Sequence, residues 1–256
     1  IQVFDSIKDY AKNIIFEKPV TLTFAEAEYI SHISKEKGIN ILVAQTRRFF
    51  PNLDFTKNFL VKRSLKKVKI TAIEGALFNW ASESDYFNNK NPNDHGVFHD
   101  VGSHIFDYII YLIESVTDIK KLEVKVIQSV FDYSQNANNS YSKVIFFNKD
   151  IEFEIEVRLS RSSNFSNMIV IDDGTYRYLT RSLMGRDIKM VTADDIISIP
   201  IPTIKPSFDL DDVFYNMWLD IENVLLKSST DVSKIALKSI LHTSRLMQSI
   251  VDEMKI

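Results

Sequence analysis

The chain has 256 residues, a formal net charge of −3 at pH 7, no cysteine and only six glycines. This length suits one large domain or two modest ones. The glycine content is about a third of the usual share of roughly 7%, and no three glycines fall within six residues of one another. The sequence therefore cannot contain a G-x-G-x-x-G dinucleotide loop, and no glycine pair brackets a G-x-x-x-x-G-K phosphate loop.

The remaining composition excludes several other classes of protein. The 31 basic and 34 acidic side chains nearly balance, so no overall field attracts nucleic acid or an anionic membrane. The lack of cysteine excludes disulfides, thiolate metal sites and a cysteine nucleophile. No apolar run approaches the roughly 20 residues of a membrane span, and no signal peptide opens the sequence. We expect a soluble, cytoplasmic, globular protein without nucleic-acid or membrane partners.

The first fifty residues alternate between helix and strand patterns. Thr23 is a good N-cap for a helix, and Gly38 is a good terminator at its other end. The aliphatic run over 39–44 is typical of a strand that is covered on both faces in a parallel sheet. This alternation of strand, helix and strand is typical of one half of a doubly wound domain. The predicted elements are a weak helix over 4–13, a short strand over 14–16, a helix over 24–37 and a strand over 39–44.

Period-two alternation dominates the rest of the chain. The segment 151–159 alternates five apolar residues with three glutamates and an arginine, which indicates a strand with one buried and one polar face. Several such segments predict an antiparallel or mixed sheet. The predicted strands are 68–80, 122–126, 142–147, 151–159, 167–171, 187–191 and 196–201, and the predicted helices are 53–65, 98–115, 209–227 and 231–254.

Histidines and aspartates cluster at residues 94–107, which read D-H-G-V-F-H-D-V-G-S-H-I-F-D. On a regular helix Asp100, His104 and Asp107 share one face. Asp100 and His104 are four residues apart, so we expect them to approach as an acid–base pair. In such a pair the carboxylate fixes the imidazole tautomer and raises its basicity.

Two other interpretations of this cluster stay open. His95 and His99 have the spacing of a zinc-binding helix, but Gly96 stands where that motif has its glutamate. The missing glutamate argues against a zinc site of this kind. These polar residues could also be ordinary surface or capping groups, because structural networks cluster charges as well.

A second candidate feature is the tripeptide Glu17-Lys18-Pro19, directly after the predicted strand over 14–16. In doubly wound sheets, ligands bind beyond the carboxyl ends of the strands. A lysine at this place is suited to a cofactor or a substrate, although by itself it could be a solvated strand-end lysine.

Taken in order, these segments resemble one known family. The resemblance runs through F-E-K-P at 16–19, A-E-A at 25–27, I-L-V-A-Q-T-R-R-F-F-P at 41–51, G-V-F-H-D-V-G-S-H-I-F-D at 96–107 and the two closing helices. The chain is similar to the glucose–fructose oxidoreductase, inositol dehydrogenase and rhizopine catabolism (Gfo/Idh/MocA) family of nicotinamide-dependent sugar oxidoreductases. The similarity covers essentially the whole chain.

This resemblance implies a two-part architecture. Residues 1–47 would be the C-terminal part of a Rossmann dinucleotide-binding domain with a parallel sheet. Residues 48–256 would form a larger α+β domain for substrate binding and oligomerisation, with an open, mostly antiparallel sheet flanked by helices. The family's opening βα units and their glycine-rich loop have no counterpart here. We therefore expect that this sequence lacks its own N-terminal portion and binds dinucleotide poorly by itself.

The resemblance also implies a catalytic set of Lys18, Asp100 and His104. In this family the histidine takes the hydroxyl proton as hydride leaves to the nicotinamide, the lysine orients the substrate, and the aspartate positions the group. A cation stabilises a developing alkoxide, and a neutral histidine is a suitable base at pH 7.

Further candidates border this set. Glu17 and Pro19, with Lys18, would lie beside a cofactor that is NAD or NADP. Arg48 and Trp80 are candidates for the wall of the substrate pocket, the alternatives being a surface arginine and a core aromatic residue.

The function predicted from the sequence is an NAD(P)-dependent dehydrogenase that acts on a sugar, a sugar nucleotide or a cyclic polyol. Two alternatives are a non-catalytic dimerisation or ligand-binding remnant of the family, and a metal-dependent hydrolase or lyase that uses His95, His99 and Asp100. The resemblance implies a homodimer or homotetramer. The polar face of the sheet, which carries Glu152, Glu154, Glu156 and Arg158, could pair with a second subunit, as is common in this family, or could be solvated.

Overall fold

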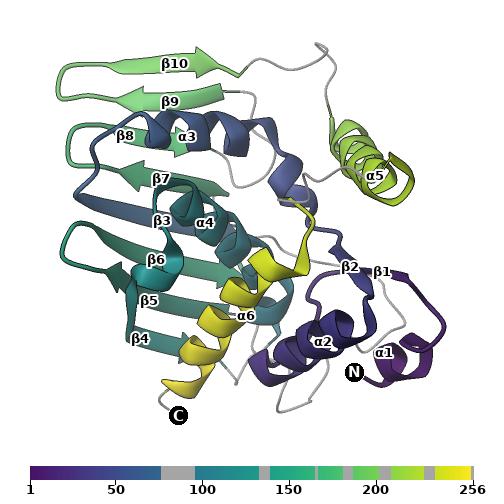
Figure 1. Cartoon of the computed structure of the whole chain (residues 1–256). Helices are drawn as coiled ribbons and strands as arrows, with labels where there is room; N and C mark the ends of the chain where they lie inside the picture. The colour runs from purple at the N-terminus through teal and green to yellow at the C-terminus, as the bar shows by residue number, and fades with distance from the viewer. Residues whose placement is uncertain are drawn as a thin grey trace.

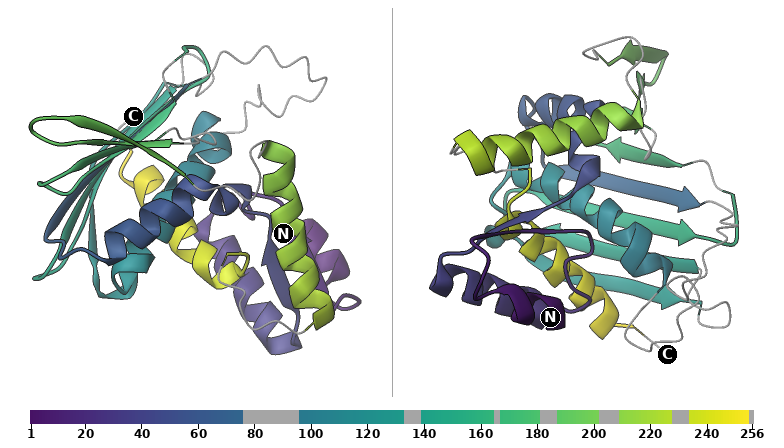
Figure 2. Two further views of the ribbon diagram at one scale, coloured as in Figure 1. Left: turned by 90° about the horizontal axis from the view of Figure 1, so that it is seen from above. Right: turned by 90° about the vertical axis from the view of Figure 1, so that its right-hand side faces the viewer.

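The structure is a computed structural model that describes residues 1–75, 96–132, 139–164, 167–180, 187–201, 209–227 and 234–254. Two sheets form its framework, a small parallel pair near the N-terminus and a larger sheet of eight strands. Helices pack against one face of the large sheet, and the small sheet lies beyond them (Figures 1 and 2).

The N-terminal unit contains α1 (Gln2–Ile7), β1 (Asn13–Phe16), α2 (Phe24–Lys37) and β2 (Asn40–Val43). The Thr23 side chain accepts a hydrogen bond from the Glu26 backbone and the Glu26 carboxylate accepts one from the Thr23 backbone, which together form a capping box. Gly38 ends α2 in the left-handed conformation, with φ of 66°. The predicted helix over 24–37 is confirmed, whereas the weak helix predicted over 4–13 ends at Ile7.

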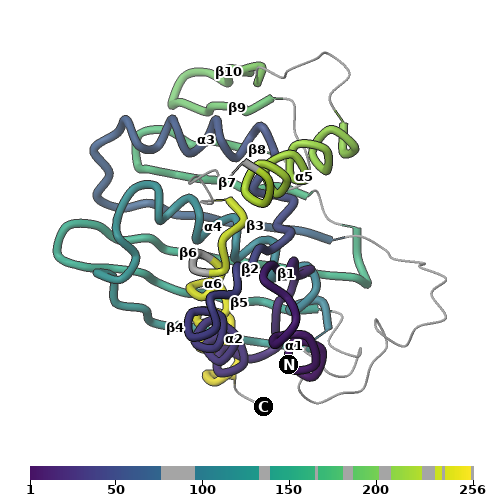
Figure 3. Tube along the Cα trace, turned by 45° about the vertical axis from the view of Figure 1, so that its right-hand side comes forward, coloured from purple at the N-terminus to yellow at the C-terminus, as the bar shows by residue number. Residues whose placement is uncertain are grey.

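The C-terminal part of the chain also contributes to this unit. β1 and β2 pair in parallel, and on the other edge of β2 the Val43 amide donates to the Ile235 carbonyl. Helix α6 (Leu237–Asp252) begins directly afterwards, and Leu237 joins a hydrophobic cluster with Ile14 and Ile30. Helices α2 and α6 therefore lie side by side (Figure 3).

The large sheet has the strand order β10-β9-β8-β7-β3-β6-β5-β4. Among the strand pairs of the described residues, the large sheet has one parallel pair, β3–β6, so the predicted open, mostly antiparallel sheet is confirmed. Strand β8 was not predicted from the sequence. The part of the predicted strand over 68–80 that follows residue 75 lies outside the described residues. The strands are β3 (Lys67–Gly75), β4 (Glu123–Phe131), β5 (Asn139–Phe147), β6 (Glu152–Ser160), β7 (Met168–Asp172), β8 (Arg177–Thr180), β9 (Asp187–Val191) and β10 (Ile196–Pro200).

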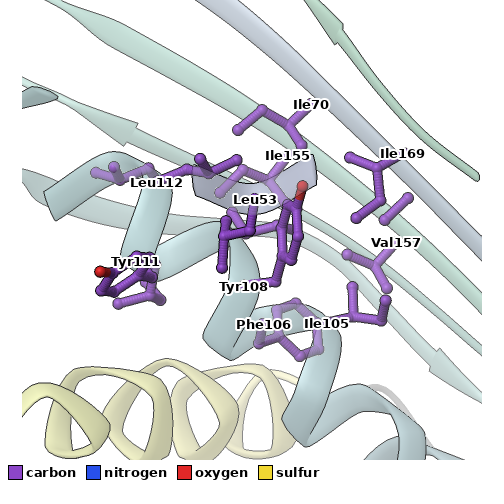
Figure 4. Close-up of a cluster of buried hydrophobic side chains, with 14 of the residues drawn as sticks. Leu53, Ile70, Ile105, Phe106, Tyr108, Tyr111, Leu112, Ile155, Val157 and Ile169 are labelled. Carbon is purple, nitrogen blue, oxygen red and sulfur yellow. The ribbon is translucent and has the colours of Figure 1, made fainter. Parts of the chain in front are cut away.

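The main core lies between this sheet and the helices. The helix α4 (Ser103–Val116) is almost wholly buried, and Tyr108 and Leu112 pack against Ile70 and Ile155 of the sheet (Figure 4). The remaining helical elements are η1 (Thr46–Phe49), α3 (Pro51–Val61), η3 (Phe98–Gly102), η4 (Ile119–Lys121) and α5 (Leu210–Lys227). Helix α3 begins earlier than predicted because proline is favoured in the first helical turn.

The opposite face of the sheet carries paired charges. Lys143 bonds to Glu154 across the β5–β6 pair at 2.7 Å, and Lys67 bonds to Glu152 across the β3–β6 pair at 2.7 Å. These contacts agree with the polar face that the alternation predicts. Among the helices of the described residues, none combines the length and the apolar character that crossing a membrane requires.

Candidate active site

Lys18 lies just beyond the carboxyl end of β1 and contacts the segment that precedes α4. Its Nζ donates to Asp100 Oδ1 at 2.9 Å and to the Asp100 carbonyl oxygen at 3.0 Å. The following peptide bond, Lys18–Pro19, is cis. The structure thus brings together two of the three residues predicted to be catalytic.

Asp100 accepts from a second cation that the sequence analysis missed. Arg161, which directly follows β6, donates from Nη2 to Asp100 Oδ2. Burial acts to raise the pKa of Asp100, but the charges and hydrogen bonds of Lys18 and Arg161 outweigh burial and hold this pKa below its ordinary value. Asp100 is therefore a carboxylate shared by two cations.

A close approach of η3 to β6 places Asp100 at this position. A Cβ atom on Gly102 would lie 3.1 Å from Leu159 Cδ1, so the absence of a side chain lets η3 pack tightly on the strand. Phe98 adds edge-to-face contacts to Phe106 and Phe131. Because β6 ends next to this contact, Arg161 emerges beside Asp100.

His104, in the first turn of α4, is partly buried. Its Nδ1 is buried and has no hydrogen-bond partner among the described residues. Burial lowers the pKa of His104 well below its ordinary value of 6.5, and the charges of Arg47 and Lys18 act in the same direction. At neutral pH the imidazole is therefore uncharged and can accept a proton.

The expected pairing of Asp100 with His104 is wrong in this structure. Both carboxylate oxygens of Asp100 bond to cations instead. Residues 98–102 form a π-helical turn, whose wider i→i+5 winding departs from the regular helix assumed in the sequence analysis. Cationic donors also bind a carboxylate more strongly than a neutral imidazole does.

Arg48 is fully buried, which contradicts the alternative of a surface arginine, whereas its place in the wall of the substrate pocket stays a prediction. Its Nε donates to Asp107 Oδ2 at 2.7 Å and its Nη2 to Oδ1 at 2.5 Å. The guanidinium also lies over the Tyr111 ring, 5.0 Å from its centroid. The pair joins η1 to α4 inside the core.

The neighbouring Arg47 forms a second ion pair. Its Nη1 and Nη2 donate to the two carboxylate oxygens of Glu74, each at 2.6 Å. Glu74 stands near the end of β3, so this pair joins η1 to the large sheet. The two adjacent arginines are visible in the sequence. That Arg47 pairs with Glu74 while Arg48 pairs with Asp107 depends on the tertiary structure.

A small cavity lies beside Lys18. Pro19 and the three residues after it form one side, His99 and Ser103 another, and α6 closes it; the lining residues are Pro19, Val20, Thr21, Leu22, Gln45, His99, Ser103, Ile240, Thr243, Ser244 and Met247. The Gln45 Oε1 atom is buried without a hydrogen-bond partner among the described residues.

Three other predicted site residues do not join the contacts around Lys18 and Asp100 in the described structure. The Glu17 side chain is exposed at the end of β1. Trp80 and His95 lie outside the described residues. Within the parts of the chain that the structure describes, no group of three or more acidic or histidine side chains could hold a metal ion.

Comparison with known structures identifies the fold. The aldose-aldose oxidoreductase of Caulobacter crescentus, solved with glycerol, matches 98% of this chain and 72% of its own at a TM-score of 0.73 and 13% identity. An inositol dehydrogenase homolog from Azotobacter vinelandii, solved with NADH and myo-inositol, matches 98% of this chain and 72% of its own at a TM-score of 0.71 and 11% identity. The fold is that of the Gfo/Idh/MocA oxidoreductases. The resemblance predicted from the sequence is thus confirmed for the fold.

Sequence comparison adds a relative among curated proteins. The scyllo-inositol 2-dehydrogenase (NADP(+)) IolW of Bacillus subtilis is 26% identical over 101 residues, which are 40% of this chain and 28% of that protein. The chain therefore aligns with less than a third of that relative's length. No family model matches the chain.

Proposed function

We propose that this chain carries the proton-transfer and substrate side of an NAD(P)-dependent oxidoreductase that acts on a hydroxyl carbon of a sugar, a sugar nucleotide or a cyclic polyol. The observation that carries the proposal is the contact of Lys18 Nζ with the Asp100 carboxylate. The lowered pKa of the nearby His104, on which the charge of Lys18 acts, supports it. The similarity of the fold to an aldose-aldose oxidoreductase and to an inositol dehydrogenase homolog supports the proposal.

The proposed roles follow from the protonation states. Oxidation of a secondary alcohol removes a proton from oxygen and a hydride from carbon. His104, held neutral, accepts the hydroxyl proton. Lys18 has three N–H donors, of which Asp100 accepts two, and the third can bind the substrate oxygen and stabilise the alkoxide that forms there. Asp100 fixes the position of the Lys18 ammonium.

The chain fits a nicotinamide cofactor in part. Glu17, Lys18 and Pro19 follow the carboxyl end of β1, where doubly wound sheets bind ligands. When bound, the nicotinamide accepts or returns the hydride. The 256 residues contain no glycine-rich loop for its pyrophosphate, and we derive no step at that part of the cofactor. The residues of this chain thus account for substrate binding and proton transfer.

Cofactor binding followed by a substrate screen tests this proposal. NAD⁺ and NADP⁺ are titrated into the 256-residue chain and into the longest product of its gene, and each protein is then assayed for reduction of these cofactors with sugars, sugar nucleotides and cyclic polyols. We expect nicotinamide reduction with at least one of these substrates. Folded protein that binds neither cofactor in either form would contradict the proposal and favour the non-catalytic alternative.

A further inference from the structure

Arg161 occupies an unusual place for a charged residue. Along β6 the odd-numbered residues Phe153, Ile155, Val157 and Leu159 are buried beneath the helices, and Arg161 continues that parity just past the end of the strand. Its side chain is only 6% exposed. An almost fully buried guanidinium requires a partner of opposite charge, because burying an unpaired charge costs free energy.

Asp100 supplies that pairing, and Lys18 shares it. Arg161 donates to one carboxylate oxygen and Lys18 to the other, so the plane of the carboxylate is fixed from two sides. Lys18 follows β1, Asp100 lies on η3 and Arg161 follows β6. The contact therefore ties the small sheet to the large sheet through a single carboxylate.

We propose that Arg161 is a positioning residue of the candidate active site, which holds the Asp100 carboxylate on Lys18 and away from His104. Because it assigns Arg161 a part in the reaction, the proposal rests on the function proposed above. Arg161 keeps the Lys18 ammonium aimed at the substrate oxygen, and it prevents Asp100 from stabilising an imidazolium on His104.

The effect of removing Arg161 on the pKa of His104 depends on the charged groups around the imidazole. Lys18 and Arg47 are the cations that act on the imidazole, Arg47 is paired with Glu74, and Asp100 is occupied by Lys18 and Arg161. Without Arg161, one carboxylate oxygen of Asp100 loses its cationic donor. An Asp100 carboxylate that is free to turn towards His104 favours the protonated imidazole, so the pKa of His104 rises.

Histidine titration by NMR tests the proposal without cofactor or substrate. The wild type is compared with Arg161→Met, with Arg161→Lys, and with Arg158→Met as the matched control. Arg158 stands on β6, three positions before Arg161, but is exposed and pairs with Glu156 on the opposite face of the sheet. We expect an upward shift of the His104 pKa in Arg161→Met, a smaller shift in Arg161→Lys, and no shift in Arg158→Met. Should Arg161→Met not fold, Arg161→Gln, which keeps an N–H donor, is expected to shift the pKa in the same direction.

The outcomes separate this proposal from the proposed function. A natively folded Arg161→Met or Arg161→Gln protein whose His104 titrates as in the wild type would overturn the positioning role, whatever the activity. If the pKa shifts as expected but no nicotinamide reaction is found with any substrate, the proposed function fails and the electrostatic role of Arg161 stands. In an active protein we expect kcat of Arg161→Met to fall by about tenfold or more with a smaller change in KM, and Arg161→Lys to restore part of it.

Discussion

Lys18 and Asp100 are 82 positions apart in the sequence, and the Lys18 Nζ donates to both the carboxylate and the backbone carbonyl of Asp100. This double contact fixes the end of β1 against the start of α4. It thereby joins a segment that resembles a dinucleotide-binding domain to the helical turn η3, which packs on the large sheet.

Replacing Asp100 with Asn tests how much this junction stabilises the protein. We expect a loss of about 2 kcal/mol in the free energy of unfolding at pH 7, because two charge-assisted hydrogen bonds are weakened in a partly buried position. The pKa of Asp100 is lower in the folded than in the unfolded state, so its contribution is present above the unfolded value and is lost as the pH falls through the folded value. Urea denaturation of both proteins from pH 7 downwards should show the difference shrinking below about pH 4. A difference that does not change with pH would contradict this account.

The buried pair of Arg48 and Asp107 should behave as a structural unit. We expect Arg48→Met or Asp107→Asn alone to destabilise the protein by about 3–5 kcal/mol, because each leaves a buried group without its partner. The double variant that combines Arg48→Met with Asp107→Asn should cost less than the sum of the two single changes. Chemical denaturation of the four proteins provides this cycle. Purely additive losses would show that the two side chains do not act together.

Gly102 should be coupled to Leu159. Gly102→Ala places a methyl group 3.1 Å from Leu159 Cδ1, and the resulting crowding opposes the gain in helix propensity of about 1 kcal/mol. We expect the substitution to be more favourable by about 1 kcal/mol in a Leu159→Val background, which removes the contacting methyl group. The melting temperatures of the wild type, both single variants and the double variant measure this coupling. Equal effects in the two backgrounds would mean that η3 does not rest on β6 at this point.

The pH dependence of turnover should reflect the lowered pKa of His104. If His104 is the base, protonation on the acidic side stops alcohol oxidation. Because burial lowers its pKa well below 6.5, we expect the acidic limb of kcat/KM for oxidation to lie below pH 6.5. A limb above that value, or one that persists in His104→Gln, would contradict the assignment. His32→Gln, an exposed histidine on α2, is the matched control.

Much of the fold was predictable because its signals are local. The period-two pattern of residues 151–159 predicts β6, and Thr23 with Gly38 predicts both ends of α2. The order of short motifs predicted the family fold. Strand β8 was missed because its four residues are too few to show a period.

The candidate site was predictable only in part. Lys18 and Asp100 were found through motifs, but their partners depend on tertiary structure. The π-helical turn at residues 98–102 has no sequence signal that we used, and it redirects Asp100. Arg161 did leave a signal, since it is a charged residue at a position whose parity along β6 is otherwise apolar.

The central claim is that Lys18 and His104 act together in nicotinamide-dependent oxidation of a hydroxyl group. Its most direct test is the initial rate of nicotinamide reduction on the substrate identified by the screen, for the wild type, Lys18→Met, His104→Gln and the control Lys12→Met, whose lysine is exposed just before β1. We predict that Lys18→Met and His104→Gln each lose about a hundredfold or more in kcat, while Lys12→Met retains the wild-type rate. Folded Lys18→Met and His104→Gln proteins that turn over at the wild-type rate would contradict the account.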